Sequence, residues 1–330
     1  MSINRLAFAT LALVLSSLGL AQTVQLEIRA SAQITDFPPP VESSNDRWTH
    51  GYMAMFTKTA SGTPPEVWMY DRRGNPVIPR RPVWFPGVYH VAIHSVAPTP
   101  DGTVLISSEV WQTGGARSVA IIAEMISDGS MRWFSRGGTI SDQLCVTSKG
   151  IIFALGGPLL GRFDKTAGFE LISRYSRTGR LEATSLPFRA SPQSRYEDIR
   201  RDSRLVTSAD GTVGFYNGGA GEWTEFDSSG QSMGTLTIPL PVSVVDKSAY
   251  KVFNIVMTSS GSVYAWLYAS SGAIEDRGIF RLDRVKRRWV KLDRSLPPLY
   301  AGIYGVDGED LITRFSTSTY AWFRINDTDE

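Results

Sequence analysis

Two turn signals that alternate along the chain with one spacing constrain its fold more than any other feature. The first is a turn that follows a β-rich run and ends in glycine, and these glycines lie 48, 61, 50 and 47 residues apart. The turns are Thr99–Gly102, Thr147–Gly150, Ser208–Gly211, Thr258–Gly261 and Val306–Gly308. Because glycine adopts positive φ without steric cost, each of these segments predicts a tight hairpin.

The second signal is a large residue followed, four positions later, by glycine. Its copies are Tyr70–Gly74, Met125–Gly129, Tyr175–Gly179 and Phe226–Gly230, with a fifth copy at Leu282–Lys286 that lacks the glycine. Both series have a period of about 50 residues, which is typical of a propeller blade of four short strands. No long apolar pattern with a 3.6-residue period occurs, so we expect few helices.

This spacing predicts an all-β, six-bladed β-propeller. The expected blades are residues 49–84, 88–137, 140–190, 202–241, 250–297, and 300–326 together with 24–31. The last segment has room for three strands only, so we expect the N-terminal strand to complete the last blade and remove an exposed sheet edge. A pair of β-sandwiches and a solenoid are the alternative folds.

The N-terminus has the features of an export signal. Arg5 precedes an apolar run over residues 6–20, and the small residues Gly19 and Ala21 predict cleavage before Gln22. The alternative is a membrane anchor, but the run is shorter than the roughly 20 residues that a span needs. We therefore expect a signal peptide at 1–21, a single domain at 22–330 without a transmembrane segment, and a secreted or periplasmic location.

Composition excludes some partners and some means of stabilisation. The formal net charge is only +2, which gives no strong field toward nucleic acid, so we expect no nucleic-acid partner. Cys145 is the single cysteine, so no disulfide can form within the chain. Since 42% of the residues are hydrophobic, burial of a large core has to stabilise the fold.

The turns carry a family resemblance. The segment Phe226–Ile238, in which an aromatic residue and Asp precede the turn glycine, is the clearest copy. This pattern resembles NHL-type and related six-bladed propellers. The resemblance implies the fold, whereas members of that superfamily bind ligands, act as scaffolds, or are lactonases or lyases, so it does not choose a function.

The two turn series share one end of a propeller, and the connections at the other end vary. Binding residues tend to lie on variable loops of a rigid scaffold, so we expect the ligand at this loop face. The longest such connection, residues 187–202, contains Arg195, Tyr196 and Arg200. Arginine forks suit carboxylates, which indicates an anion-binding or partner-binding loop, and a solvated insertion is the alternative.

Histidines and aromatic residues give further candidates near this face. His90 and His94 are four residues apart in an expected strand, so their side chains should share a face. Together with Asp142 they are candidates for a metal or acid–base site, with purely structural histidines as the alternative. Trp84, Phe85, Tyr89 and Trp111 are candidates for an aromatic wall, with core packing as the alternative.

We therefore predict an exported propeller that binds a peptide, glycan or protein partner at its loop face. The alternative is a metal-dependent or His/Asp-based lactonase-like or lyase-like enzyme at the channel mouth. Binding without catalysis is the favoured interpretation. No cofactor is predicted, and a divalent metal is left open.

Overall fold

A computed structural model describes residues 25–33, 47–57, 63–114, 118–137, 139–158, 168–188, 196, 199, 203–208, 211–239, 250–269, 278–292, 302–314 and 319–326. The regular elements in these ranges are the β-strands β1 to β24, which confirms the all-β prediction. The predicted signal peptide lies outside the described residues. No helix in these ranges is long and apolar enough to cross a membrane.

Four of the sheets have four antiparallel strands each, paired in chain order. The first contains β6 (Val88–Pro98), β7 (Val104–Gln112), β8 (Ser118–Met125) and β9 (Met131–Gly137). The second contains β10 (Thr139–Val146), β11 (Ile152–Pro158), β12 (Phe169–Tyr175) and β13 (Leu181–Phe188). The third contains β14 (Arg204–Thr207), β15 (Val213–Asn217), β16 (Glu222–Phe226) and β17 (Ser232–Thr237). The fourth contains β18 (Tyr250–Met257), β19 (Val263–Ala269), β20 (Gly278–Asp283) and β21 (Arg288–Lys291).

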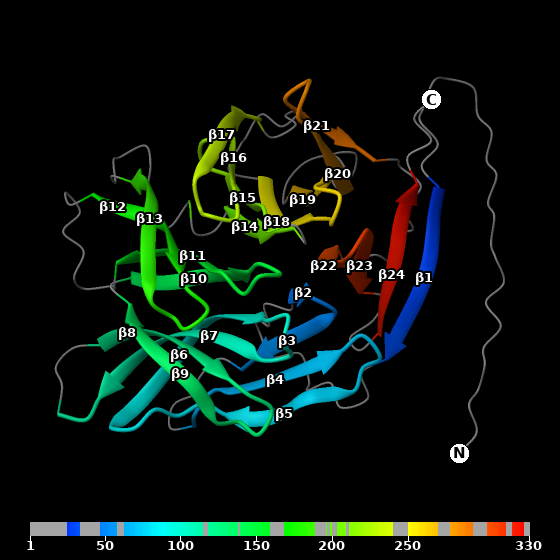
Figure 1. The fold of residues 1–330 in the computed structure, drawn as a ribbon. Helices are drawn as coiled ribbons and strands as arrows, with labels where there is room; N and C mark the ends of the chain where they lie inside the picture. The colour runs from blue at the N-terminus through cyan, green and yellow to red at the C-terminus, as the bar shows by residue number, and fades with distance from the viewer. Residues whose placement is uncertain are drawn as a thin grey trace, which may run out of the picture.

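The remaining sheet has eight strands and brings the two ends of the chain together. One half contains β2 (Arg47–Thr49), β3 (Tyr52–Phe56), β4 (Glu66–Asp71) and β5 (Pro76–Pro82). The other half contains β22 (Ile303–Asp307), β23 (Asp310–Arg314), β24 (Thr319–Asn326) and β1 (Gln25–Gln33). A parallel contact between Trp48 and Gly305 joins β2 to β22. Antiparallel pairing joins β1 to β24, which lie side by side in Figure 1.

The sheets are arranged around a common centre, with the first strand of each set of four on the inside (Figure 1). These inner strands contact one another in chain order, from β2 to β6, β10, β14, β18 and β22, and β22 contacts β2. The sheet boundaries differ from the expected blade boundaries by only a few residues. The spacing of the turns therefore predicted the segmentation of the chain into strand groups.

Both faces of the inner strands are buried between neighbouring sheets. On one face of β6, Val96 belongs to a cluster that also contains Met69 of β4. On the opposite face, Ala97 packs in a cluster with Ile152 of β11. Burial of a large aliphatic side chain stabilises the fold by about 1.5–3 kcal/mol, so contacts between sheets favour apolar residues on both faces of an inner strand.

The predicted glycine turns have the expected backbone geometry. Positive φ occurs at Gly102, Gly150, Gly211, Gly261 and Gly308, and at Gly74, Gly129, Gly179 and Gly230 of the second series. The fifth copy of the second series differs from the prediction of a turn ending at Lys286. Its turn spans residues 284–287, and Arg287 has a φ of 51°, the conformation for which glycine serves in the other copies.

In each of the inner strands β6, β10 and β18, a polar side chain forms a hydrogen bond with the next sheet. The Ser95 hydroxyl accepts a hydrogen bond from the Leu144 amide. Gln143 donates to the Ser203 carbonyl and accepts from the Leu205 amide. Asn254 donates to the Ile303 carbonyl. These three side chains each lie four residues before the threonine of the following turn, so the repeat carries its own contacts between sheets.

Candidate functional site

The strand groups have different connections at their two ends. We call the end that carries both glycine-turn series the turn end, and the opposite end the loop end. Side chains of neighbouring strand groups pair at the turn end, in Asp101–Arg177, Glu225–Arg284, Arg72–Asp307 and Ser260–Glu309. The turn end therefore carries contacts between turns that are far apart in sequence.

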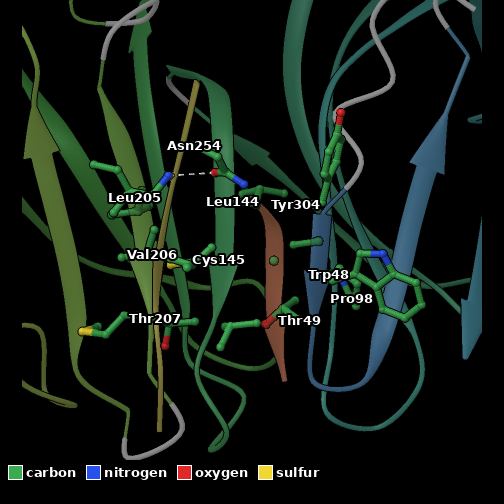
Figure 2. A pocket seen from close by; sticks show the side chains of 16 residues that line it. Trp48, Thr49, Pro98, Leu144, Cys145, Leu205, Val206, Thr207, Asn254 and Tyr304 are labelled. Atoms are coloured by element: carbon green, nitrogen blue, oxygen red, sulfur yellow. Dashed lines mark hydrogen bonds between the residues drawn. The ribbon is translucent and has the colours of Figure 1, made fainter. Parts of the chain in front are cut away.

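A central channel of about 50 Å³ lies between the inner strands, and Figure 2 shows its lining. Each of the six inner strands contributes to it. The lining residues are Trp48, Thr49, Ala97, Pro98, Leu144, Cys145, Leu205, Val206, Thr207, Asn254, Ile255, Val256, Met257, Tyr304, Gly305 and Val306. This lining is mostly apolar, and it includes no carboxylate and no imidazole among the described residues.

The polar side chains of this channel already have structural roles. Asn254 bonds to the Ile303 carbonyl at 2.9 Å, and its own side-chain oxygen accepts from the Ile255 amide. The Tyr304 ring packs edge-on against Tyr320, with ring centroids 6.1 Å apart. Cys145 is only 6% exposed. The lining of the channel is therefore mainly apolar, and Asn254 and Tyr304 are engaged in contacts within the protein.

His90 and Trp111 are cross-strand partners near the loop end of sheet β6–β9. Their rings meet edge-to-face, with centroids 4.7 Å apart. His94 lies at a register shift of β6, and its Nε2 is 3.7 Å from a carboxylate oxygen of Glu109. Glu109 and Trp111 are two residues apart on β7 and share a face, so the two histidines also lie on one face of this sheet.

Asp142 and Tyr196 were both predicted as site residues, and the structure brings them together. The Tyr196 hydroxyl donates a hydrogen bond of 2.6 Å to Asp142. The Tyr196 ring also packs edge-on against Phe169 and tilted against Phe188, with centroids 5.4 and 6.3 Å away. A side chain at Gly157 would overlap this ring. Tyr196 thus anchors the connection between β13 and β14 to the core of its sheet.

The residues predicted for a metal or acid–base site contact different neighbours. His94 pairs with Glu109, and Asp142 accepts from Tyr196, so these residues have different principal partners. Within the described ranges, no group of three His, Cys, Asp or Glu side chains is arranged to hold a metal ion. Arg195 and Arg200 lie outside the described residues.

Two aromatic side chains at the loop end are exposed to solvent. Trp84, in the connection from β5 to β6, is 48% exposed, and Tyr89, at the start of β6, is 58% exposed. Both are close to His90 in sequence, and both lie at the loop end, as the His90–Trp111 pair does. Phe85, between them, is buried in the core, so only part of the aromatic run is available to a partner.

His50 was not predicted as a functional residue, and its position carries no motif. It lies in the turn from β2 to β3 with a φ of 53°, and its Nε2–H donates to the Val146 carbonyl at 2.8 Å. Burial lowers the pKa of His50 below its ordinary value, and the bond to Val146 offsets this only in part. His50 is therefore a neutral contact from β2 to β10 at the turn end.

The comparisons with known proteins support the propeller fold. No protein-family profile and no curated protein sequence matches the chain. A DUF4221-family protein from Bacteroides vulgatus has a similar structure, with a TM-score of 0.55, 10% identity, and coverage of 93% of this chain and 99% of that one. A luciferin-regenerating enzyme gives a TM-score of 0.51 and 10% identity, and covers 91% of this chain and 96% of its own.

A virginiamycin B lyase from Staphylococcus aureus is also similar, with a TM-score of 0.45, 11% identity, and coverage of 92% of this chain and all of that one. A WD40 β-propeller domain is similar with a TM-score of 0.39 and 14% identity. The resemblance to propeller proteins rests on the arrangement of the sheets and on the DUF4221-family neighbour. The more specific resemblance to NHL-type propellers stays a prediction. At these identities the likeness concerns the fold alone.

Proposed function

We propose that residues 22–330 form an exported, six-bladed β-propeller that binds a peptide segment of a protein partner at its loop end. The inner-strand contacts in chain order support six blades around one channel. The pairing of β1 with β24 supports a ring whose last blade is completed by the N-terminal strand. Two structural neighbours with TM-scores above 0.5 support the same architecture.

The observation that carries the binding proposal is the exposure of Trp84 and Tyr89 at the loop end. Tryptophan and tyrosine are enriched among the residues that dominate binding energy in protein interfaces. The half-buried His90–Trp111 pair lies at the same end of sheet β6–β9. We call Trp84, Tyr89, His90 and Trp111 the aromatic patch, and we propose that it contacts apolar side chains of the partner.

The contacts around the central channel support a role of the protein as a rigid scaffold. Its polar side chains hold neighbouring sheets together, as Asn254 does with Ile303. A rigid scaffold that presents an aromatic surface loses little conformational entropy on binding. The enzymatic alternative rests on His90, His94 and Asp142, and two of these contact Glu109 and Tyr196. Binding therefore ranks first.

The test is selection of a displayed random-peptide library on the mature protein, followed by affinity measurement of the enriched peptides. The double variant Trp84→Ala with Tyr89→Ala should weaken binding at least about tenfold, as expected for interface anchors. The double variant Leu181→Ala with Met233→Ala removes two other exposed apolar side chains and is the matched control. Equal binding by the aromatic variant would contradict the proposal.

Three further measurements separate the alternatives. Binding on a glycan array without any enriched peptide would change the partner class to a glycan. A rise in melting temperature with one divalent ion, reversed by EDTA, would favour the metal-dependent enzyme, because a ligand of the folded state stabilises it by mass action. N-terminal sequencing of the exported protein should begin at Gln22.

A further inference from the structure

A second cavity lies at the turn end, on the opposite side of the molecule from the aromatic patch. It is a crevice of about 150 Å³ between sheets β6–β9 and β10–β13. Its lining residues are Thr99, Pro100, Asp101, Leu105, Glu124, Val146, Ser148, Lys149, Gly150, Ile152 and Arg177. This volume is below the range of about 300–1,000 Å³ that is typical of sites for drug-sized ligands, so the crevice suits a smaller molecule.

The two walls of this crevice carry opposite charges. Sheet β6–β9 contributes the carboxylates of Asp101 and Glu124, and sheet β10–β13 contributes the cations of Lys149 and Arg177. At the rim, Arg177 forms an ion pair with Asp101, and both side chains are largely solvent-exposed. Such a pair stabilises the fold by at most about 1 kcal/mol, so a ligand can replace it at little cost.

Glu124 is the buried polar group of the site. It is only 5% exposed. It accepts hydrogen bonds from the Thr103 hydroxyl at 2.6 Å and from Arg132 at 2.9 Å, and both bonds end on Oε1. The bond from Arg132 is charge-assisted and offsets part of the desolvation of this carboxylate. Glu124 also lines the crevice, so it adds negative charge to that wall.

The floor of the crevice is apolar. Leu105, Val146 and Ile152 line it, and each is 1% exposed. Pro100 adds an apolar group from the turn between β6 and β7. The site thus combines one buried carboxylate, two cations on the facing wall and an apolar floor.

We propose that this crevice binds a small zwitterion with an apolar body, namely a free amino acid or dipeptide with aliphatic side chains. The ammonium group of the ligand faces Glu124 and the acidic wall. Its carboxylate faces Lys149 and Arg177, which suit carboxylates as a point charge and a planar fork. The aliphatic side chain contacts the floor at Leu105 and Ile152.

The experiment measures binding of four probes to the mature protein by calorimetry. The probes are L-leucine, L-leucyl-L-leucine, L-leucinamide, which lacks the carboxylate, and N-acetyl-L-leucine, which lacks the ammonium group. We expect saturable binding of leucine or the dipeptide, and affinity at least about tenfold lower for both single-charge analogues, since each loses a charge-assisted contact. Equal affinities for all probes, or no binding of either zwitterion up to about 10 mM, weaker than most specific sites, would overturn the proposal.

Variants assign each wall to one charge of the ligand. Lys149→Gln with Arg177→Gln should weaken leucine binding at least about tenfold but leave binding of leucinamide unchanged. Glu124→Gln keeps the shape of the side chain and should weaken leucine but not N-acetyl-leucine. Lys286→Gln, an exposed cation in another turn, is the control. If Glu124→Gln does not fold, the cation variants and the probe series decide alone, and loss of leucinamide binding in the cation variants would contradict the assignment.

Discussion

The central channel, of about 50 Å³, and the turn-end crevice, of about 150 Å³, are built in different ways. All six inner strands contribute to the channel, and its lining is mostly apolar. Two sheets form the crevice, and its charged residues lie in turns or on β8. Every repeat therefore contributes to the channel, whereas the crevice is formed by two neighbouring repeats.

This difference separates residues that hold the fold from residues that are free to bind. Near the channel, the side chains of Gln143 and Asn254 are used in bonds to neighbouring strands. Around the crevice, Lys149 and Arg177 are exposed and contribute little to packing. Substitutions near the channel should therefore change stability, and substitutions around the crevice should change binding.

The largest expected effect concerns the contact between β2 and β22. Gly305→Ala would place a methyl group against the carbonyl oxygen and Cβ of Trp48, where backbone must move. We expect a loss of about 3 kcal/mol in the free energy of unfolding, at the upper end for an overpacked core. Urea denaturation measures it. Gly219→Ala, at an exposed turn with space for a methyl group, is the control, and equal losses in both variants would contradict the structure.

The next effect concerns the bonds between sheets. Gln143→Leu removes a donor to the Ser203 carbonyl and an acceptor for the buried Leu205 amide. Because an unpaired buried polar group costs about 1–3 kcal/mol, we expect a loss of about 2 kcal/mol in denaturant unfolding. Gln231→Leu, an exposed site of the same chemistry, should change stability much less. A neutral Gln143→Leu variant would show that the channel does not depend on these bonds.

A smaller effect is expected at the crevice. Lys149→Gln with Arg177→Gln removes two exposed cations and one exposed ion pair. We expect stability to change by less than about 1 kcal/mol, because exposed pairs are worth little. Thermal and urea unfolding measure this change. A loss as large as that of Gln143→Leu would mean that the crevice residues hold the fold, and the contrast between the two cavities would fail.

The smallest effect is the pH dependence of His50. Burial lowers its pKa in the folded state, so below the ordinary value of about 6.5 the unfolded chain binds a proton that the folded chain does not. Stability should therefore fall as pH falls from about 6.5 toward the lowered pKa. In His50→Asn, which retains a residue type that tolerates positive φ, this fall should be smaller. Urea unfolding at pH 7 and pH 5 gives the change in the free energy of unfolding for each protein. An identical change in His50→Asn and in the parent protein would exclude a contribution from His50.

The sequence predicted the periodic part of the molecule and missed contacts that depend on three-dimensional proximity. Glycine turns such as that at Gly150 have a local cause, because positive φ is a property of one residue. The pairing of Tyr196 with Asp142 joins residues 54 positions apart, and that of Arg177 with Asp101 joins residues 76 apart. Such pairs depend on how adjacent sheets face each other, which no local pattern encodes.

The polar side chains that bond between sheets were present in the sequence but unnoticed. Ser95, Gln143 and Asn254 each lie four residues before a turn threonine, so comparison of aligned repeats would have found them. Arg287 was missed for a different reason. Its turn is one residue longer than its counterparts, so the expected glycine position does not apply.

The pairing of β1 with β24 has a consequence for the order in which the chain folds. The ribosome makes β1 long before β24, and the two strands pair with each other. Contacts between segments far apart in sequence are slow to form, because loop closure has to precede them. Residues 25–33 therefore stay without this partner until β24 has been made, so this pairing is a late step of folding.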